Sequence, residues 1–234
     1  MNKSRKFAAL IIITVFLIIY NDVAHAQEVT DDEVHGLYVP PKKVFTGGIV
    51  AGMSLAQVDG DYFAGYYKFG LNAGPIVYAQ VGKRVALSME MLYSQKGSKS
   101  NIPTASITLP NVIINNYGIN TNYVEVPVMI NYYDKHKSSI GIGFSYNRLI
   151  NSHETLDVDS ANILKSINLN NNYPFLPNTF DFLAGVNLHL WKGFYGNLRF
   201  QYSITPIRTD IPPNYSRAVQ YNNLFVLRLM YLLR

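Results

Sequence analysis

The feature that most constrains the fold of this chain is a strict alternation of residue types that recurs in eight segments. In YVEVPVMINYY, residues 123–133, every second position is valine, isoleucine or tyrosine, and glutamate, proline, methionine or asparagine lies between them. A period of two residues predicts a β-strand with two unlike faces. The segments that follow this pattern are 47–57, 68–81, 85–95, 122–133, 138–147, 179–190, 194–204 and 222–234.

The links between these segments alternate in length. Three are tight turns and four are longer: the turns are 82–84, 134–137 and 191–193, and the longer links are 58–67, 96–121, 148–178 and 205–221. Outer-membrane β-barrels have short periplasmic turns and long extracellular loops in this order. The sequence therefore predicts an all-β fold, an eight-stranded antiparallel transmembrane β-barrel with its long loops at the cell surface.

The two faces of the predicted strands differ as a membrane barrel requires. Charged residues make up only 15% of the chain, against about 25% in ordinary soluble domains. One face carries aliphatic residues in the middle of the strands and aromatic residues near the ends, namely Phe69, Tyr93, Tyr146, Phe180, Phe182, Tyr202 and Phe225 at the long-loop ends and Tyr132, Phe194 and Tyr231 at the short-turn ends. Two such belts mark two membrane interfaces. The other face is glycine, serine and asparagine, which suits a narrow interior.

The N-terminus has the three parts of a secretory signal peptide in residues 1–26: basic residues, an apolar run and the sequence Ala24-His25-Ala26. The alternative is a transmembrane helix, but the apolar run of residues 7–20 is shorter than the roughly 20 residues that a helix needs. Cleavage after Ala26 leaves 17 basic and 14 acidic residues, a net charge of +3. We expect residues 27–44 to form a periplasmic tail and residues 45–234 the barrel, in the outer membrane of a Gram-negative bacterium.

Four charged residues are predicted to face the lumen. Glu90 and Glu125 lie on the third and fourth segments, and Arg199 and Arg228 lie on the seventh and eighth, which face them across a ring of eight. We expect cross-lumen ion pairs that plug the barrel, because a buried charge without a partner costs roughly 3–5 kcal/mol. The alternative role for the four residues is a gate or a proton site.

Proline interrupts two of the predicted strands. Pro127 and Pro75 lie inside segments that otherwise alternate, and proline in a sheet is normally confined to edges and bulges. A closed barrel has no edge, so we expect a β-bulge at each.

No pattern indicates a catalytic site, a cofactor or a nucleic-acid partner. The histidines have no ligand spacing, and GMSLA, residues 52–56, lies inside a strand rather than on the elbow that a nucleophilic serine needs. Asp157, Asp159 and Glu154 could hold a divalent cation, but a solvated polar loop accounts for them as well. We therefore predict no enzyme activity and no metal.

Two stretches resemble a known family. The run from Gly47 to Ser98 has a glycine-rich first strand and ends in EMLYSQKG, and residues 123–127 read YVEVP. Both resemble the PorT-like family of outer-membrane β-barrel domains, and the resemblance extends over about residues 45–234. It implies an outer-membrane barrel and, more distantly, a part in protein secretion.

The resulting hypothesis is a monomeric barrel that serves as a structural or interaction component of the cell envelope. Its partners would be outer-membrane lipid and envelope or secretion-system proteins, which would contact loops 96–121 and 148–178. Two alternatives stay open: a secreted soluble β-barrel that binds a small apolar ligand, and a narrow solute channel, for which eight strands leave little room.

Overall fold

The computed structural model describes residues 44–61, 65–100, 104–105, 112–160, 163–167, 174–209 and 216–233. The strands are β1 (Phe45–Asp61), β2 (Lys68–Gln80), β3 (Val85–Glu90), β4 (Leu92–Ser100), β5 (Thr104–Ala105), β6 (Val112–Tyr133), β7 (Ser139–Ser160), β8 (Ile163–Ile167), β9 (Asn178–Trp191), β10 (Phe194–Ser203) and β11 (Ser216–Leu232). Among the described residues, no helix is long and apolar enough to cross a membrane. The predicted signal peptide and nearly all of the predicted tail lie outside the described residues.

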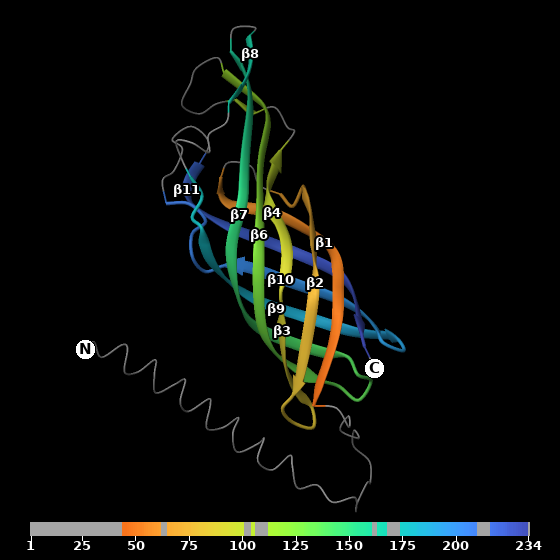
Figure 1. The fold of residues 1–234 in the computed structure, drawn as a ribbon. Coiled ribbons are helices and arrows are strands. Elements are labelled where there is room, and N and C mark those ends of the chain that lie inside the picture. The colour runs from red at the N-terminus through yellow and green to blue at the C-terminus, as the bar shows by residue number, and fades with distance from the viewer. Residues whose placement is uncertain are drawn as a thin grey trace, which may run out of the picture.

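The sheet closes into a barrel because β1 pairs with β2 on one side and with β11 on the other, antiparallel in both cases. The ring runs β1, β2, β3 with β4, β6, β7, β9, β10 and β11 (Figure 1). β3 and β4 lie end to end and occupy one position in the ring. The nine strands therefore fill eight positions, and we call each position a stave. The predicted eight-stranded antiparallel barrel is confirmed, and β5 and β8 are short additions at the long-loop end.

β3 and β4 are two parts of one stave that is interrupted only at Met91. The register against β2 and against β6 is the same on both sides of this residue. This register places Pro75 opposite Met91 and Pro127 opposite Glu90, so each neighbouring strand lacks one backbone donor at this level. The predicted bulges are wrong: the pairing of β1 with β2 and of β6 with β7 runs through both prolines without a shift. The prolines interrupt the stave between them instead.

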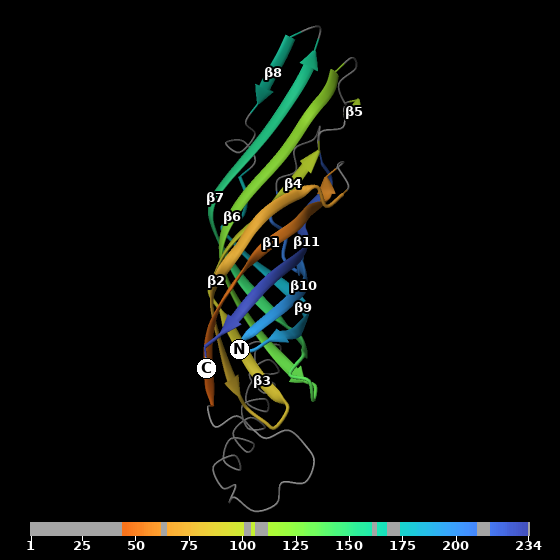
Figure 2. The same cartoon turned by 90° about the vertical axis from the view of Figure 1, so that its right-hand side faces the viewer.

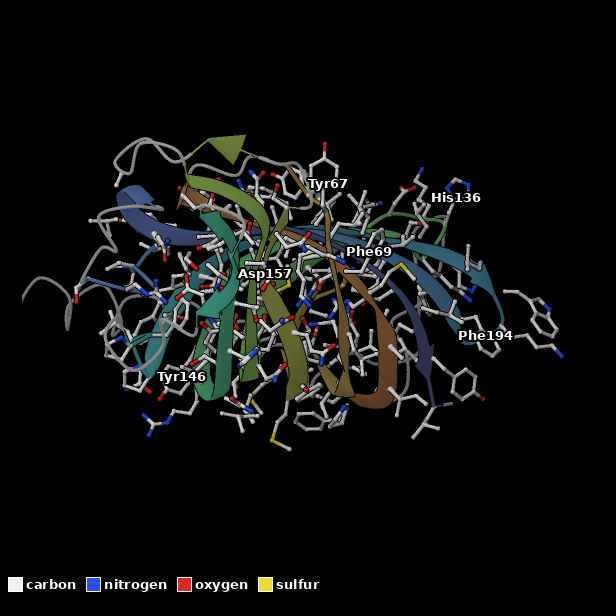
Figure 3. The ribbon with its side chains drawn as sticks, turned by 90° about the horizontal axis from the view of Figure 1, so that it is seen from above. Tyr67, Phe69, His136, Tyr146, Asp157 and Phe194 are labelled. Carbon is white, nitrogen blue, oxygen red and sulfur yellow. The ribbon has the colours of Figure 1, made fainter. Side chains whose placement is uncertain are left out.

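The outward face of the barrel is apolar. Ile140 and Ile142 expose 62% of their surface and Phe69 exposes 65%. Seen along the barrel, Tyr146 and Phe194 point away from the ring (Figure 3). The valine face of residues 123–133 is thus outward, as the alternation predicts.

Side chains fill the interior. At the short-turn end a buried apolar group occupies it, formed by Val50, Ile76, Tyr78, Ala86, Leu92 and Met230. A smaller group of Ala56, Leu224 and Val226 lies nearer the long-loop end. Between and around these groups the interior is polar, and it holds the charged residues described below.

Two strands run far beyond the rest of the wall. β6 and β7 have 22 residues each, whereas roughly 9–11 residues suffice for a strand to cross a bilayer. Figures 1 and 2 show both strands continuing past the other staves to β8. We call residues 112–122 of β6, residues 151–160 of β7, and β8 the projection. The predicted loops 96–121 and 148–178 are therefore in large part strand, which corrects the predicted ends of these segments.

A β-bulge in β7 marks the base of the projection. The pairing register of β6 with β7 shifts between Asn122 and Tyr123, and Ile150 is the extra residue. A bulge moves the residues beyond it by one position. The inward face of β7 therefore changes from odd to even numbers, so that Asn147 is buried before the bulge and Glu154 after it.

Close contact between β6 and β7 depends on Gly143. A Cβ atom there would lie 2.1 Å from the Val128 carbonyl oxygen, whereas a Cβ at Gly118 on β6 meets nothing within 4 Å. Gly143→Ala is expected to lower the free energy of unfolding by about 1–3 kcal/mol, the usual cost of overpacking. Urea unfolding in detergent, followed by the gel mobility of unheated samples, measures this. Gly118→Ala is the matched control, and equal midpoints for the two variants would contradict the packing.

Candidate functional site

The interior carries charged side chains in three groups, stacked along the barrel axis. The inner cluster is Glu90, Arg199 and Arg228, contributed by β3, β10 and β11. Arg199 donates to both carboxylate oxygens of Glu90, with its second nitrogen 3.2 Å from Oε2, and Arg228 donates to Oε2 at 2.8 Å. All three side chains are at least 97% buried. Two cations thus share one carboxylate inside the barrel.

Arg228 is held by more than its ion pair. Its Nε donates to Asn197 at 2.8 Å, and its NH1 also donates to Asn72 at 3.1 Å. Gly52 lies opposite Arg228 in the pairing of β1 with β11, where a Cβ would meet the Arg228 side chain at 2.8 Å. The glycine-rich first strand therefore leaves the space that this arginine occupies.

The middle cluster is Lys96, Glu125 and Asp181, contributed by β4, β6 and β9. The Lys96 ammonium lies 2.7 Å from Asp181 and 3.3 Å from Glu125, and both of these ion pairs are fully buried. Gln201 joins the carboxylates, since its amide lies 2.8 Å from a Glu125 oxygen and 2.6 Å from an Asp181 oxygen. Ser203 donates to the other Asp181 oxygen at 2.9 Å.

The two clusters balance each other. The inner cluster has two cations and one anion, a net charge of +1, and the middle cluster has one cation and two anions, a net charge of −1. Together they are neutral. Because each cluster by itself would leave one buried charge uncompensated, the interior is best regarded as one network of six charged groups.

The outer cluster, Glu154 with Arg208, lies at the long-loop end. Arg208 donates to both oxygens of Glu154, at 3.3 and 2.6 Å, and Tyr117 donates to one of them at 3.0 Å. The Arg208 guanidinium also lies 3.9 Å from the centre of the Phe175 ring. Burial, with the adjacent Glu154 carboxylate, raises the pKa of Tyr117 well above its ordinary value. The link between β10 and β11 is thereby fastened to β7.

The structure brings three of the four predicted charges together and places the fourth elsewhere. Glu90 contacts both predicted arginines, whereas Glu125 contacts Lys96, a residue that the sequence had put in a loop. Lys96 lies an even number of residues after Glu90 and so shares its inward face. A prediction that extended the third strand to this residue would have placed Lys96 in the lumen. Asp181 lies between two outward phenylalanines, and the alternation alone places it inside. No comparable signal identifies Arg208, which lies in an irregular link.

The acidic residues considered for a cation are not assembled for one. Glu154 is occupied by Arg208, and Asp157 accepts from Asn116 at 3.3 Å. The side chain of Asp159 lies outside the described residues. Within the described part of the chain, no group of three His, Asp or Glu side chains is placed to hold a metal ion.

Comparison with known proteins agrees with this architecture. The sequence matches the outer membrane protein beta-barrel domain over residues 43–208. The chain belongs to this family. It is an outer-membrane β-barrel, so its short turns lie in the periplasm and its long-loop end faces the cell exterior. No curated protein matches the sequence.

Several solved barrels are similar to it. Ail, the attachment invasion locus protein of Yersinia pestis, has a TM-score of 0.44 and 10% identity, covering 80% of this chain and 98% of its own. Neisserial surface protein A has a TM-score of 0.44 and 7% identity, covering 81% and 97%. The outer-membrane protein AlkL has a TM-score of 0.32 and 11% identity, covering 88% and 96%.

The inner cluster leads to a test of how the interior is held together. Glu90→Leu leaves two buried arginines without their carboxylate and is expected to lower the free energy of unfolding by roughly 3–5 kcal/mol. The triple variant Glu90→Leu, Arg199→Met and Arg228→Met removes the charges together. No side chain of the inner cluster is then left without its ion-pair partner, and the buried charge that remains uncompensated is the net −1 of the middle cluster.

The triple variant is expected to be more stable than Glu90→Leu alone, because well-packed apolar residues often replace a buried ion cluster at little cost. The same urea titration in detergent measures both proteins. A triple variant that is less stable by the sum of three separate losses would show that the charges act independently of one another.

Proposed function

We propose that this protein is a non-conducting, non-enzymatic barrel whose projection binds a protein partner at the cell surface. The observation that carries the proposal is the length of β6 and β7. A strand of 22 residues extends over roughly 70 Å, more than twice the roughly 30 Å of the hydrocarbon core. Only the lower part of these strands is needed to cross the membrane. The rest places a two-stranded surface, extended by β8, outside the outer leaflet.

The closed interior supports the absence of conduction. The inner and middle clusters fill successive levels of the lumen with buried, mutually bound side chains. Below them lies the apolar group at the periplasmic end. Eight strands enclose a space that side chains fill, and this favours a plug over the alternatives of a gate, a proton site and a narrow solute channel.

The faces of the barrel also oppose a soluble ligand carrier. Such a protein turns its apolar face inward and a charged face to water. Here exposed isoleucines and phenylalanines cover the outside, and the charged network occupies the place where an apolar ligand would sit.

The projection has the properties of a binding surface. Asn116, Asn120 and His153 are exposed on it. β8 pairs with β7 and is the last strand of the sheet on that side within the described residues. A strand at the end of a sheet presents backbone donors and acceptors to which a partner strand can add. The resemblance of residues 47–98 to PorT-like barrels makes protein-secretion components the first partners to examine.

Absence of conduction is tested in a planar lipid bilayer. The purified protein is expected to give no steady current at moderate voltage, because the buried side chains of the two clusters occupy the lumen at two levels. A variant that removes side chains from both levels, Arg228→Ala with Lys96→Ala, serves as the control for a lumen that can be opened. Steady current through the unmodified protein would contradict the plug.

Surface binding is tested by photo-crosslinking in intact cells. A photoreactive residue at His153 on the projection is expected to give discrete protein adducts, because this position faces the exterior. The same residue at Ile140, which is 62% exposed on the membrane face, is expected to contact lipid and to give none. Adducts at neither position, or equally at both, would contradict a role for the projection.

A further inference from the structure

A shallow groove of about 580 Å³ lies on the membrane face of the barrel. It passes over β6, β7, β9, β10 and β11, on a different part of the molecule from the projection. Its walls are aliphatic and aromatic, and its lining includes Ile130, Tyr132, Ile142, Ala184, Leu198 and Phe200. Ligand sites in proteins have volumes of roughly 300–1,000 Å³, so this hollow is large enough to hold part of a lipid.

The groove exists because one small residue interrupts a row of large ones. In the strand register Ala184 lies between Ile142 on β7 and Phe200 on β10. Beside it, Gly141 and Gly185 face each other across β7 and β9, and their backbones line the same hollow. The result is a depression between two ridges of bulky side chains.

The lower end of the groove lies in the periplasmic leaflet. The groove runs from Phe225 of β11, past Ala184 near the middle of β9, to Tyr132, which is next to the last residue of β6 at the periplasmic end. Arg84, in the turn between β2 and β3, donates to the Tyr132 hydroxyl at 3.3 Å. The lower mouth of the groove therefore opens at the level of phospholipid headgroups.

The periplasmic turns around this mouth are strongly basic. They carry Lys83, Arg84, Lys135, Lys137 and Lys192.

The single acidic residue of these described turns is Asp134. A hydrogen bond with His136 holds the pKa of Asp134 below its ordinary value, and the two groups lie 3.0 Å apart. Asp134 is therefore an anion at neutral pH, but five cations outnumber it.

We propose that the groove is a binding site for an anionic phospholipid of the periplasmic leaflet. One acyl chain lies in the hollow over Ala184, and the phosphate headgroup lies among the basic turns. Basic residues beside a membrane surface attract anionic lipid headgroups, and the fit of the chain in the groove distinguishes this site from the general lipid annulus.

Charge argues against a second copy of the protein as the occupant. Two copies in one membrane share the same orientation, so pairing through this groove would bring their basic turns together. Like charges placed opposite each other disfavour association, whereas a phospholipid supplies the opposite charge at the same level.

The only tryptophan of the chain gives a direct measurement. Trp191 is the last residue of β9, beside the basic mouth, with the Lys192 ammonium 4.5 Å from its ring centre. The full chain is reconstituted in phosphatidylcholine vesicles that contain acyl-brominated phosphatidylglycerol or acyl-brominated phosphatidylcholine at equal mole fraction. Brominated phosphatidylglycerol is expected to quench Trp191 more strongly, with a binding preference of about fivefold for each cation engaged.

One double variant and one single variant separate the two parts of the site, and a second single variant is the control. Arg84→Gln with Lys137→Gln is expected to reduce the preference for phosphatidylglycerol toward one. Ala184→Phe fills the groove and is expected to do the same with every charge in place. Ala73→Phe, on the outward face of β2 between Ala51 and Tyr93, is the matched control and should keep the preference.

Each outcome decides the matter. Equal quenching by the two brominated lipids in the unmodified protein overturns the site. If the preference for phosphatidylglycerol persists in Ala184→Phe, the basic turns alone attract the lipid, and the proposed binding of an acyl chain in the groove is wrong. A doubled particle mass in light scattering that Ala184→Phe abolishes would make the occupant a second copy. Gel mobility of unheated samples confirms that each variant compared is folded.

Discussion

The antiparallel pairing of β1 with β11 is the interaction on which the rest of the structure depends, because it leaves the ring without an edge. A membrane has no water to satisfy unpaired backbone groups, so an open sheet of the same strands would not be stable there. Closure at eight staves also fixes a narrow interior. Any charge that faces inward must then find its partner within that interior. Glu90 and Asp181 do so by contacting side chains from strands on other parts of the ring.

The charge balance of the interior follows from this constraint. Neither cluster is neutral by itself, and a barrel that kept only one of them would bury a net charge. The opposite imbalances at adjacent levels allow six ionised groups to be buried with no net charge. Hydrogen bonds from Gln201 and Asn197 extend the network beyond the ion pairs. Such a network ties five different staves together, and it leaves the projection as the part of the chain that is free to meet other molecules.

The sequence was sufficient for the barrel because each strand inside the membrane has one face against lipid and one against the lumen, which preserves the period of two. Above the membrane the outward face is polar as well, so the alternation fades and the ends of β6 and β7 could not be predicted. The bulge at Ile150 adds a second difficulty, because it exchanges the inward and outward positions of β7 and thereby turns Glu154 inward. The inward position of Asp181 could be predicted from the outward phenylalanines on either side of it. The inward position of Lys96 could be predicted if the third strand was taken to be longer. The position of Arg208 depends on how a link without periodicity folds across the barrel.

The place of the projection in the ring explains why the outer cluster is needed. In the stave order, β6 and β7 lie opposite the pairing of β1 with β11, so the wall is tall on one side and lower at the side where the chain closes. This difference leaves the outer mouth open toward the closing strands. Arg208, in the link between β10 and β11, spans this opening. Its backbone forms an isolated antiparallel β-bridge with Gln220 of β11, and its side chain forms an ion pair with Glu154 of β7. The bulge that aims Glu154 inward is therefore what allows the tall side of the wall to be tied to the closing side. The tie between the tall side of the wall and the closing side thus depends on one local change in the register of β7.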